Sequence, residues 1–358
     1  MVFGPAWQTA RNIELNSLTE TRPDAARAQV RAAAERLLAD LARGERLTSG
    51  WNDEPLSFAL VRTAMDQCVS RLAETGLWGR DNQPLSNEFW AIAGKILSRG
   101  PMQVRARTKP RGYAGDHELF AWICDGLDTP DPLGRQFDRY FQQQAAVESV
   151  RARTDQIAAA IATRCFRIDG AGEPFRVASV GSGPAIDIER AAKLLNESQR
   201  RRLAVTLLDL DAEALEHGRE RLGGWLHEEQ LTLVRDNLYR LADKPAAAAP
   251  LAGADVLVCA GFFDYLADEP AKTLLGLFWR HLAPGGMLLV GNFAPHCPTR
   301  AFMEWIGNWY LIYRRADELA RLAEQAGIPA PCVRIGAERM GIDLFLCATK
   351  DCRGFTNS

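Results

Sequence analysis

The sequence predicts an α/β fold in which a mostly parallel, seven-stranded sheet follows a helical N-terminal region. Up to about residue 165 apolar residues recur at helical spacing, whereas from Phe175 onward short apolar runs alternate with helical stretches. Two final apolar runs flank Glu338–Gly341 and indicate a hairpin, hence one antiparallel edge. We therefore expect a helical lid or substrate domain over residues 1–165 and a sheet domain over residues 166–358.

The helical region is divided by residues that start or stop helices. Gly76 is a predicted stop, Ser86 or Asn87 a predicted N-cap, and Asp116 the cap of a short helix. A stretch rich in glycine and proline, residues 100–115, interrupts the helices. The predicted helices cover residues 23–43, 55–74, a segment from Ser86, a segment from 116 to 125, and a long helix over 132–165.

Seven apolar runs are predicted as strands. The first five alternate with helical stretches, which is typical of a parallel sheet built from βαβ units. The predicted strands cover residues 175–180, 203–209, 230–234, 254–260, 286–292, 330–337 and 342–349.

Composition excludes several classes of partner. The formal net charge is −2 over 358 residues, so no basic surface indicates nucleic acid. The eight cysteines are scattered without C-x-x-C spacing, and we expect no metal site. Cys124, Cys259 and Cys347 lie in apolar runs and are expected to be buried free thiols, which favours a reducing, cytoplasmic setting. We see no signal peptide and no membrane span, and we expect a small-molecule substrate, with a homodimer left open.

The strongest motif is a glycine turn after the first strand, Gly181–Ala185, followed by acids after the second strand, Asp209 and Asp211. Glycines let the backbone approach a nucleoside, and the acid accepts hydrogen bonds from ribose hydroxyls. A dinucleotide site would need a third glycine at Ile186, and a P-loop would need Gly-Lys-Ser/Thr, so neither is predicted.

This pattern resembles the first motif of class I S-adenosylmethionine (SAM) dependent methyltransferases, with Ala185 in place of the last glycine. The resemblance continues in order through Asp236, the strand and loop over Ala254–Asp264, and the Pro-Gly-Gly turn in Leu282–Asn292. It implies a Rossmann-like sheet, SAM as cofactor, and cofactor contacts by Gly181, Ser182, Gly183, Asp209, Asp211, Asp236, Asn237, Ala260, Gly261 and Phe262.

Three segments are expected to close over this site. In residues 108–116 we expect Arg111 and Asp116 to bind substrate, since guanidinium suits a carboxylate, and Tyr113 to act in catalysis. After the fourth strand, Phe262 or Tyr265 offers an aromatic face to a cation.

The third closing segment covers residues 292–315. Here Asn292 and Arg300 are expected to bind substrate, and His296 to take a proton, since the pKa of an unperturbed imidazole is about 6.5. Tyr310 and Tyr313 lie three apart, can share a helix face, and are further catalytic candidates.

Residues Lys109–Asp116, Asn292–Pro295 and Trp309–Tyr313 are similar to a bacterial group that joins a helical region to a class I methyltransferase domain. Members are described as forming methyl esters of 3-hydroxy fatty acids, and the layout also resembles enzymes that cyclise SAM to azetidine-2-carboxylate. The resemblance implies an enzyme of secondary metabolism or signalling that methylates a small acceptor, such as a carboxylate. Two alternatives stay open: a cyclase in which the SAM α-amine attacks Cγ and methylthioadenosine leaves, and a non-catalytic SAM-binding protein.

Overall fold

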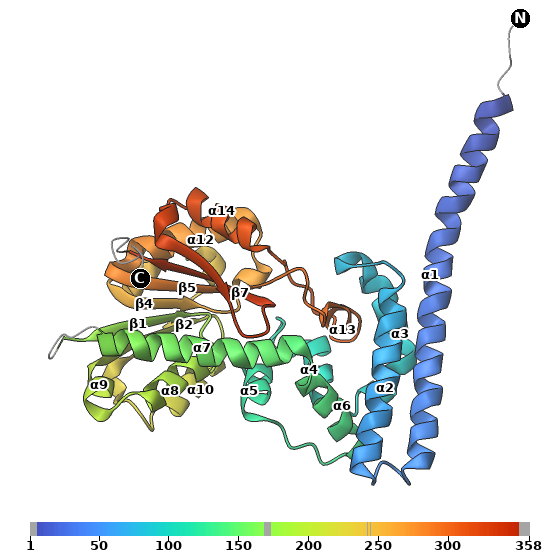
Figure 1. Ribbon diagram of the computed structural model, residues 1–358, viewed down its shortest axis with the longest axis horizontal. Helices are drawn as coiled ribbons and strands as arrows, with labels where there is room; N and C mark the ends of the chain where they lie inside the picture. Colours follow the sequence, from blue (N-terminus) through green and yellow to red (C-terminus); the bar gives the residue numbers. More distant parts are fainter. Residues whose placement is uncertain (1–5, 168–172, 242, 244, 351–358) are drawn as a thin grey trace, which may run out of the picture. The chain divides into compact units, whose positions relative to one another are not determined.

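The computed structural model describes residues 6–167, 173–241, 243 and 245–350, and the chain divides into two compact units (Figure 1). The helical unit comprises residues 1–110, 128–142 and 299–310, and the sheet unit comprises residues 111–127, 143–298 and 311–358. Each unit is therefore assembled from three separate stretches of chain. The predicted division at residue 165 stays a prediction, because compactness does not establish which segments fold independently.

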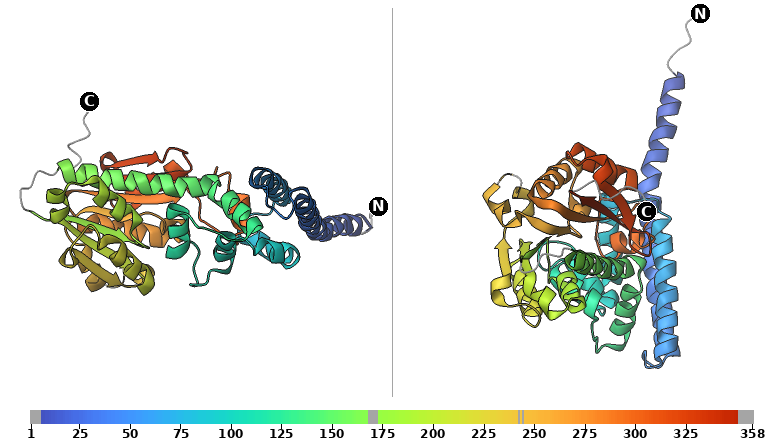
Figure 2. Two further views of the ribbon diagram at one scale, coloured as in Figure 1. Left: turned by 90° about the horizontal axis from the view of Figure 1, so that it is seen from below. Right: turned by 60° about the vertical axis from the view of Figure 1, so that its left-hand side comes forward.

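The helical unit is built from helices that pack side by side. The antiparallel pair α1 and α2 lies together in both Figures 1 and 2, α3 also packs on α1, and α13 packs on α2 and α3. Val61, Met65 and Leu72 of α2 are fully buried, as the helical spacing requires. The helices are α1 (Ala6–Leu47), α2 (Glu54–Ala73), α3 (Gln83–Leu97), α4 (Pro101–Thr108), α6 (Pro132–Gln142) and α13 (Arg300–Trp305), with a 3₁₀ turn η1 (Gly79–Asn82) before α3.

Three helical expectations were wrong. Ser86 does not cap a helix, because α3 begins at Gln83 with Pro84 in its first turn, and Ser86 is buried inside it. The stretch 100–115 contains a helix, α4, rather than only an interruption.

The predicted helix over 132–165 is in fact two helices, α6 and α7 (Ala145–Arg167). The break falls at Gln143 and Gln144, and the Gln144 carbonyl accepts from Val147 and Glu148 to start α7. Neither glycine nor proline marks the break, so the periodicity gave no sign of it.

The sheet has the order β3-β2-β1-β4-β5-β7-β6, with β7 antiparallel to both β5 and β6 and the other neighbours parallel. This confirms the predicted class: a Rossmann-like, seven-stranded α/β sheet with a helical N-terminal region. The strands are β1 (Phe175–Val180), β2 (Leu203–Asp209), β3 (Leu231–Arg235), β4 (Ala254–Cys259), β5 (Leu282–Phe293), β6 (Val333–Ala337) and β7 (Asp343–Thr349).

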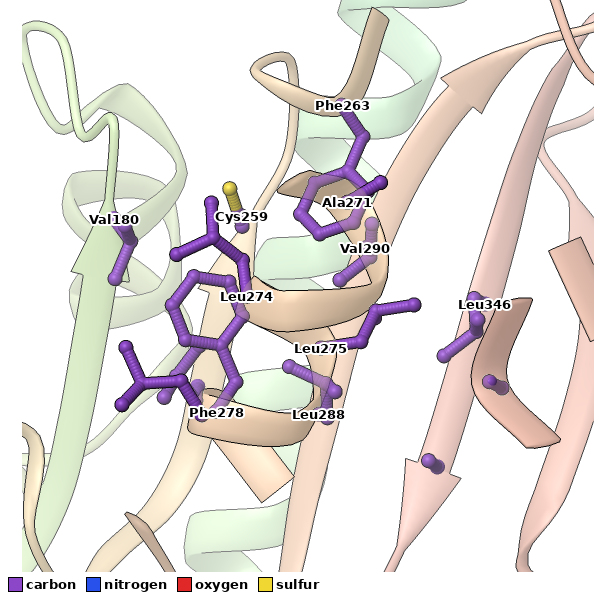
Figure 3. Packing of buried hydrophobic residues seen from close by; sticks show 14 of the residues in the cluster. Val180, Cys259, Phe263, Ala271, Leu274, Leu275, Phe278, Leu288, Val290 and Leu346 are labelled. Carbon is purple, nitrogen blue, oxygen red and sulfur yellow. The ribbon is translucent and has the colours of Figure 1, made fainter. Parts of the chain in front are cut away.

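Helices cover both faces of the sheet, as parallel strands require (Figure 1). On one face lie α7, α8 (Ile186–Leu194) and α10 (Ala212–Leu222), whose buried side chains include Ile157, Ile161 and Leu215. On the other lie α12 (Asp268–His281) and α14 (Ala316–Gln325). Figure 3 shows Leu274, Leu275 and Phe278 of α12 packed against the strands. Shorter elements of this unit include α5 (His117–Asp125), α9 (Glu197–Arg202) and α11 (Pro245–Ala248).

The strand order places a ligand site. β1 lies between β2 and β4, so the chain runs outward in one direction from β1 and in the other from β4. In open α/β sheets the crevice at such a reversal, beyond the carboxyl ends of the strands, is where ligands bind. The glycine turn follows β1 at this point.

The cysteines differ in state. Cys259 is a buried free thiol as expected, Cys124 and Cys347 are free but only partly buried, and Cys332 is disulfide-bonded.

Across the described residues, no helix is both long enough and apolar enough to cross a bilayer. The cytoplasmic setting stays a prediction.

Candidate functional site

The turn after β1 needs glycine at two positions. Gly181 and Gly183 have φ of 64° and 51°, the left-handed region that side chains disfavour. The Gly181 amide donates to the Leu208 carbonyl at 2.8 Å, which ties the turn to the end of β2. A Cβ on Gly181 would lie 3.4 Å from Leu238, so a side chain would crowd the crevice.

Ala185 takes the place of the third motif glycine and keeps a glycine-like backbone. Its φ is 53° and its side chain is fully buried at the start of α8. Left-handed backbone costs an L-residue roughly 1–2 kcal/mol. The departure from the motif therefore changes the side chain and leaves the shape of the turn intact.

Asp209, at the end of β2, joins this turn directly. Its carboxylate accepts from the Gly183 amide at 2.9 Å and from the Asp211 amide at 3.0 Å. Burial raises the pKa of Asp209 above its ordinary value, and the neighbouring charge of Asp211 adds to that rise. The predicted glycine and acid motifs are thus brought together at the switch point of the sheet.

The second acid, Asp211, holds the segment 111–117. Arg111 approaches its carboxylate at 3.4 Å and also pairs with Glu213, and Tyr113 donates to Asp211 at 3.1 Å. Burial, then the charges of Asp209 and Asp211, raises the pKa of Tyr113 far above its usual range. The Tyr113 hydroxyl therefore stays protonated and acts as a donor.

His117 is a site residue that sequence reasoning missed. Its buried ring places Nδ1 3.3 Å from the Asp211 carboxylate, at an angle that makes no hydrogen bond. Burial lowers the pKa of His117, although Asp211 opposes that shift. A histidine directly after the Asp116 cap was the available signal, because it opens a short helix beside the closing segment.

Asp116 has a local task. It is buried, and its side chain accepts from the Leu119 amide at 3.0 Å as the N-cap of α5. Tyr265 donates to the Ala114 carbonyl at 3.3 Å, which attaches the closing segment to the loop after β4. The substrate-binding role of Asp116 stays a prediction.

Beyond β3, Asp236 and Asn237 are partly exposed at the same edge of the sheet. The Asp236 amide donates to the Asp209 carbonyl at 3.1 Å, and its carboxylate accepts from the Asn237 amide at 2.7 Å. Phe262 meets Tyr239 edge to face, with ring centroids 5.1 Å apart. Polar groups and an aromatic face thus lie close to the glycine turn.

Ala260 and Gly261 pass over a buried arginine that sequence reasoning missed. A Cβ on Gly261 would lie 3.3 Å from a guanidinium nitrogen of Arg153 on α7. Arg153 pairs with Asp343 of β7 at 2.6 Å, and both side chains are buried. An acid inside an apolar strand was the available signal, since such a charge needs a partner.

Asn292 belongs to a second buried network. Its amide donates to Asp264 and to the Ile312 carbonyl, both at 2.9 Å, and its oxygen accepts from Arg314 at 2.8 Å. Asp264 also accepts from the Phe293 amide at 2.8 Å. The predicted substrate contact is therefore fully buried and occupied by its own unit, and its role stays a prediction.

Two other predicted residues of the segment 292–315, His296 and Tyr313, belong to the same unit as this network. His296 is exposed, with Nε2 2.9 Å from the Gly341 carbonyl. Tyr313 lines a surface pocket of about 300 Å³ together with Arg321 and Gln325. Their catalytic roles stay predictions.

Tyr310 and Tyr313 do not share a helix face. The helix α13 ends at Trp305, and Asn308 takes a left-handed φ of 49°, after which the chain has no helix until α14. Tyr310 and Arg300 belong to the helical unit, whereas Tyr313 belongs to the sheet unit. The three-residue spacing predicts a shared helix face. Gly307 and Asn308, which precede both tyrosines, are the residues in the sequence that disfavour a helix there.

Within the described residues, no group of three or more histidine, cysteine, aspartate or glutamate side chains is arranged to hold a metal.

Residues 179–288 match the family model of a methyltransferase domain. The matched segment begins in β1 and ends in β5, so it contains the glycine turn, both acids and the loop after β4. It covers under a third of the chain, and the match describes the sheet core.

The chain is also similar to solved structures. One, described as a possible exported protein from Bordetella parapertussis, is 18% identical over 91% of this chain and 96% of its own, with a TM-score of 0.54. The CurJ carbon methyltransferase aligns at 13% identity, 94% and 96% coverage and a TM-score of 0.48. The magnesium protoporphyrin IX methyltransferase of Synechocystis PCC 6803 is 14% identical over 59% of this chain and 89% of its own, with a TM-score of 0.42. The first similarity shows the fold; no curated protein matches the chain.

Proposed function

We propose that the protein binds SAM at the carboxyl ends of β1 to β4 and transfers its methyl group to a small-molecule acceptor. The observation that carries the proposal is the bond from the Gly183 amide to Asp209, which joins the glycine turn and the acid at the switch point. Both residues lie inside the segment that matches a methyltransferase domain.

The residues of the site fit an adenosyl group. The side-chain-free turn at Gly181 and Gly183 leaves room for close backbone approach, and Asp209 is an acceptor for the ribose hydroxyls. Asp236 is partly exposed beyond β3, where it would accept from the adenine amino group. Phe262 supplies an aromatic face.

When bound, SAM supplies a methyl group on a positively charged sulfur. The protein's part is to position the acceptor and to exclude water from the reacting atoms. The segment 111–117 is suited to exclusion, since Tyr113 and Arg111 fasten it to Asp211.

We propose a carboxylate as the acceptor group. A carboxylate is already ionised and needs no base, which agrees with a Tyr113 that keeps its proton and a His296 that faces solvent. A hydroxyl or amine acceptor would instead require a group placed to take its proton.

The test begins with purified protein and SAM alone, followed by liquid chromatography and mass spectrometry. Intact SAM, and then S-adenosylhomocysteine plus a methyl ester once carboxylic acids are added, would support the proposal. Methylthioadenosine with a new amino acid, formed above the rate without enzyme, would replace it with SAM cyclisation. SAM binding without turnover for any acceptor would leave a binding protein only.

A further inference from the structure

The helical unit gathers positive charge around Tyr310. The guanidinium of Arg80 lies 5.6 Å from the Tyr310 ring centre, Lys109 donates to the Asn308 carbonyl, and Arg107 donates to the Trp305 and Ile306 carbonyls. All three cations therefore contact the segment 305–310. Within the described residues none of Arg80, Arg107 and Lys109 forms an ion pair with a carboxylate.

Arg107 is the buried member of this group. It donates to the Ser86 hydroxyl at 3.0 Å, to the Trp305 and Ile306 carbonyls at 3.2 Å, and it stacks on Trp90 at 4.6 Å. All of these partners are neutral, so its hydrogen bonds are satisfied while its charge is not cancelled.

Lys109 is held beside it by the backbone. It takes a left-handed φ of 48° at the end of α4, and its Nζ donates to the Asn308 carbonyl at 2.6 Å. Burial, then Arg107 and Arg80, lowers the pKa of Lys109 to about 8. An ammonium has three donors, and one is used here.

Glu304, which shares Asn82 with Tyr310 as a hydrogen-bond partner, is already paired with other groups. Glu304 is buried, accepts from the Gly79 amide at 2.7 Å and from Asn82 at 3.0 Å, and pairs with Arg300 at 2.7 Å. Tyr310 joins the same network by donating to Asn82 at 2.9 Å. Because Glu304 pairs with Arg300, it does not serve as an ion-pair partner for Arg80, Arg107 or Lys109.

We infer that the helical unit carries a binding site for an oxyanion, a carboxylate or phosphate group, between Arg80 and Lys109. Guanidinium presents a planar fork that suits two oxygens, and the Tyr310 ring orients it. The bound anion would cancel the repulsion between the two cations. This inference does not rest on the proposed methyl transfer.

Calorimetric titration with inorganic phosphate and with acetate tests the site, with sodium chloride added to hold the ionic strength constant so that general screening is matched. We expect binding of at least one anion, weakened about tenfold or more in Arg80→Ala and in Lys109→Gln. The matched control is Lys95→Gln, which removes an exposed lysine of the same unit.

Either anion alone supports the site and identifies the source, phosphate or carboxylate. Failure of both anions to bind, or equal binding by wild type and Lys109→Gln, overturns the inference. A second measurement covers variants that fold poorly: the carbon-13 titration of Lys109 in the wild type. Added phosphate should raise the Lys109 pKa, and an unchanged pKa would also overturn the site.

Discussion

Asp209 is the residue at which the separate motifs meet. Its carboxylate accepts from the Gly183 amide in the glycine turn and from the Asp211 amide in the loop after β2. The two hydrogen bonds orient the carboxylate before any ligand binds. A pre-oriented acceptor adds affinity because less ordering is required on binding.

We therefore expect Asp209→Asn to weaken SAM binding by about ten- to hundredfold, since a hydrogen bond to a charged group contributes about 1.5–3 kcal/mol. The amide oxygen can still accept from one of the two backbone amides, that of Gly183 or that of Asp211, so we expect the fold to persist. Calorimetry with SAM checks this, with the exposed Glu216→Gln on α10 as control. Equal affinity in the two variants would contradict the role of Asp209.

Asp264 gives a second residue-scale prediction, for the pH dependence of stability. Burial, then the Asp343 carboxylate, raises the pKa of Asp264 to about 8. The native state thus keeps a proton that the unfolded state loses near pH 4, so this contribution to stability is lost as pH rises through 8.

Asp264→Asn should therefore flatten the fall in unfolding free energy between about pH 6.5 and 8. Three other buried carboxyls, Asp138, Asp187 and Asp343, have pKa values raised to about 6, so most of their ionisation is complete below that interval. Urea unfolding at several pH values measures the slope. A slope identical to that of the wild type would show that Asp264 is ionised throughout.

The sequence predicted which of the proposed cofactor residues lie together better than it predicted the surroundings of the proposed substrate residues. Gly183, Asp209 and Asp236 follow different strands, and the carboxyl ends of parallel strands meet at one edge, so order along the chain implied proximity. No comparable rule predicts which residues contact Asn292 and Tyr310. Their partners, Arg314 and Asn82, depend on packing between distant segments, which spacing does not encode.

At the scale of elements, one ion pair joins α7 to β7 through Arg153 and Asp343. The pair lies beside the loop after β4, as the close approach of Gly261 shows. An ion pair buried here requires both partners, because either charge alone is costly in the interior.

Arg153→Met should destabilise the protein by about 3–5 kcal/mol, because it leaves Asp343 buried without its partner. The double variant Arg153→Met with Asp343→Leu should recover much of that loss. Urea unfolding of the wild type and both variants measures the difference. Equal stabilities for the two variants would mean that the uncompensated charge is not the cause.

Elements were predicted where a local signal existed. The Asp116 cap and the ends of β1 and β2 agree with the structure, since caps and apolar runs act locally. The break between α6 and α7 falls in a run of glutamines, and the two halves pack in different units. Tertiary packing ended the helix there, against a local preference to continue.

At the scale of the whole molecule, the packing of α7 determines which fragments of the chain can keep a complete core. Ile157, Ala158 and Ile161 of α7 are fully buried in the core on one face of the sheet. A fragment of residues 166–358 lacks nearly all of this helix and exposes the part of that face that α7 covers.

We expect the 166–358 fragment to aggregate or to unfold without a cooperative transition, and the 143–358 fragment to unfold cooperatively at a higher temperature. Circular dichroism during heating makes the comparison, with the full chain as reference. Equal midpoints for the 166–358 fragment and the full chain would instead support a domain boundary at residue 165.

The assembly of the helical unit from three stretches also bears on synthesis. Ser86 donates to the Trp305 carbonyl, and Asn82 and the Gly79 amide donate to Glu304. These early residues can form their native hydrogen bonds only after residues 304 and 305 have been synthesised. Ribosomes add about 5–20 residues per second, which separates the emergence of these partners by tens of seconds. During that interval α2 and α3 have no α13 to pack against. We therefore expect chaperones that shield apolar surface to bind the nascent chain.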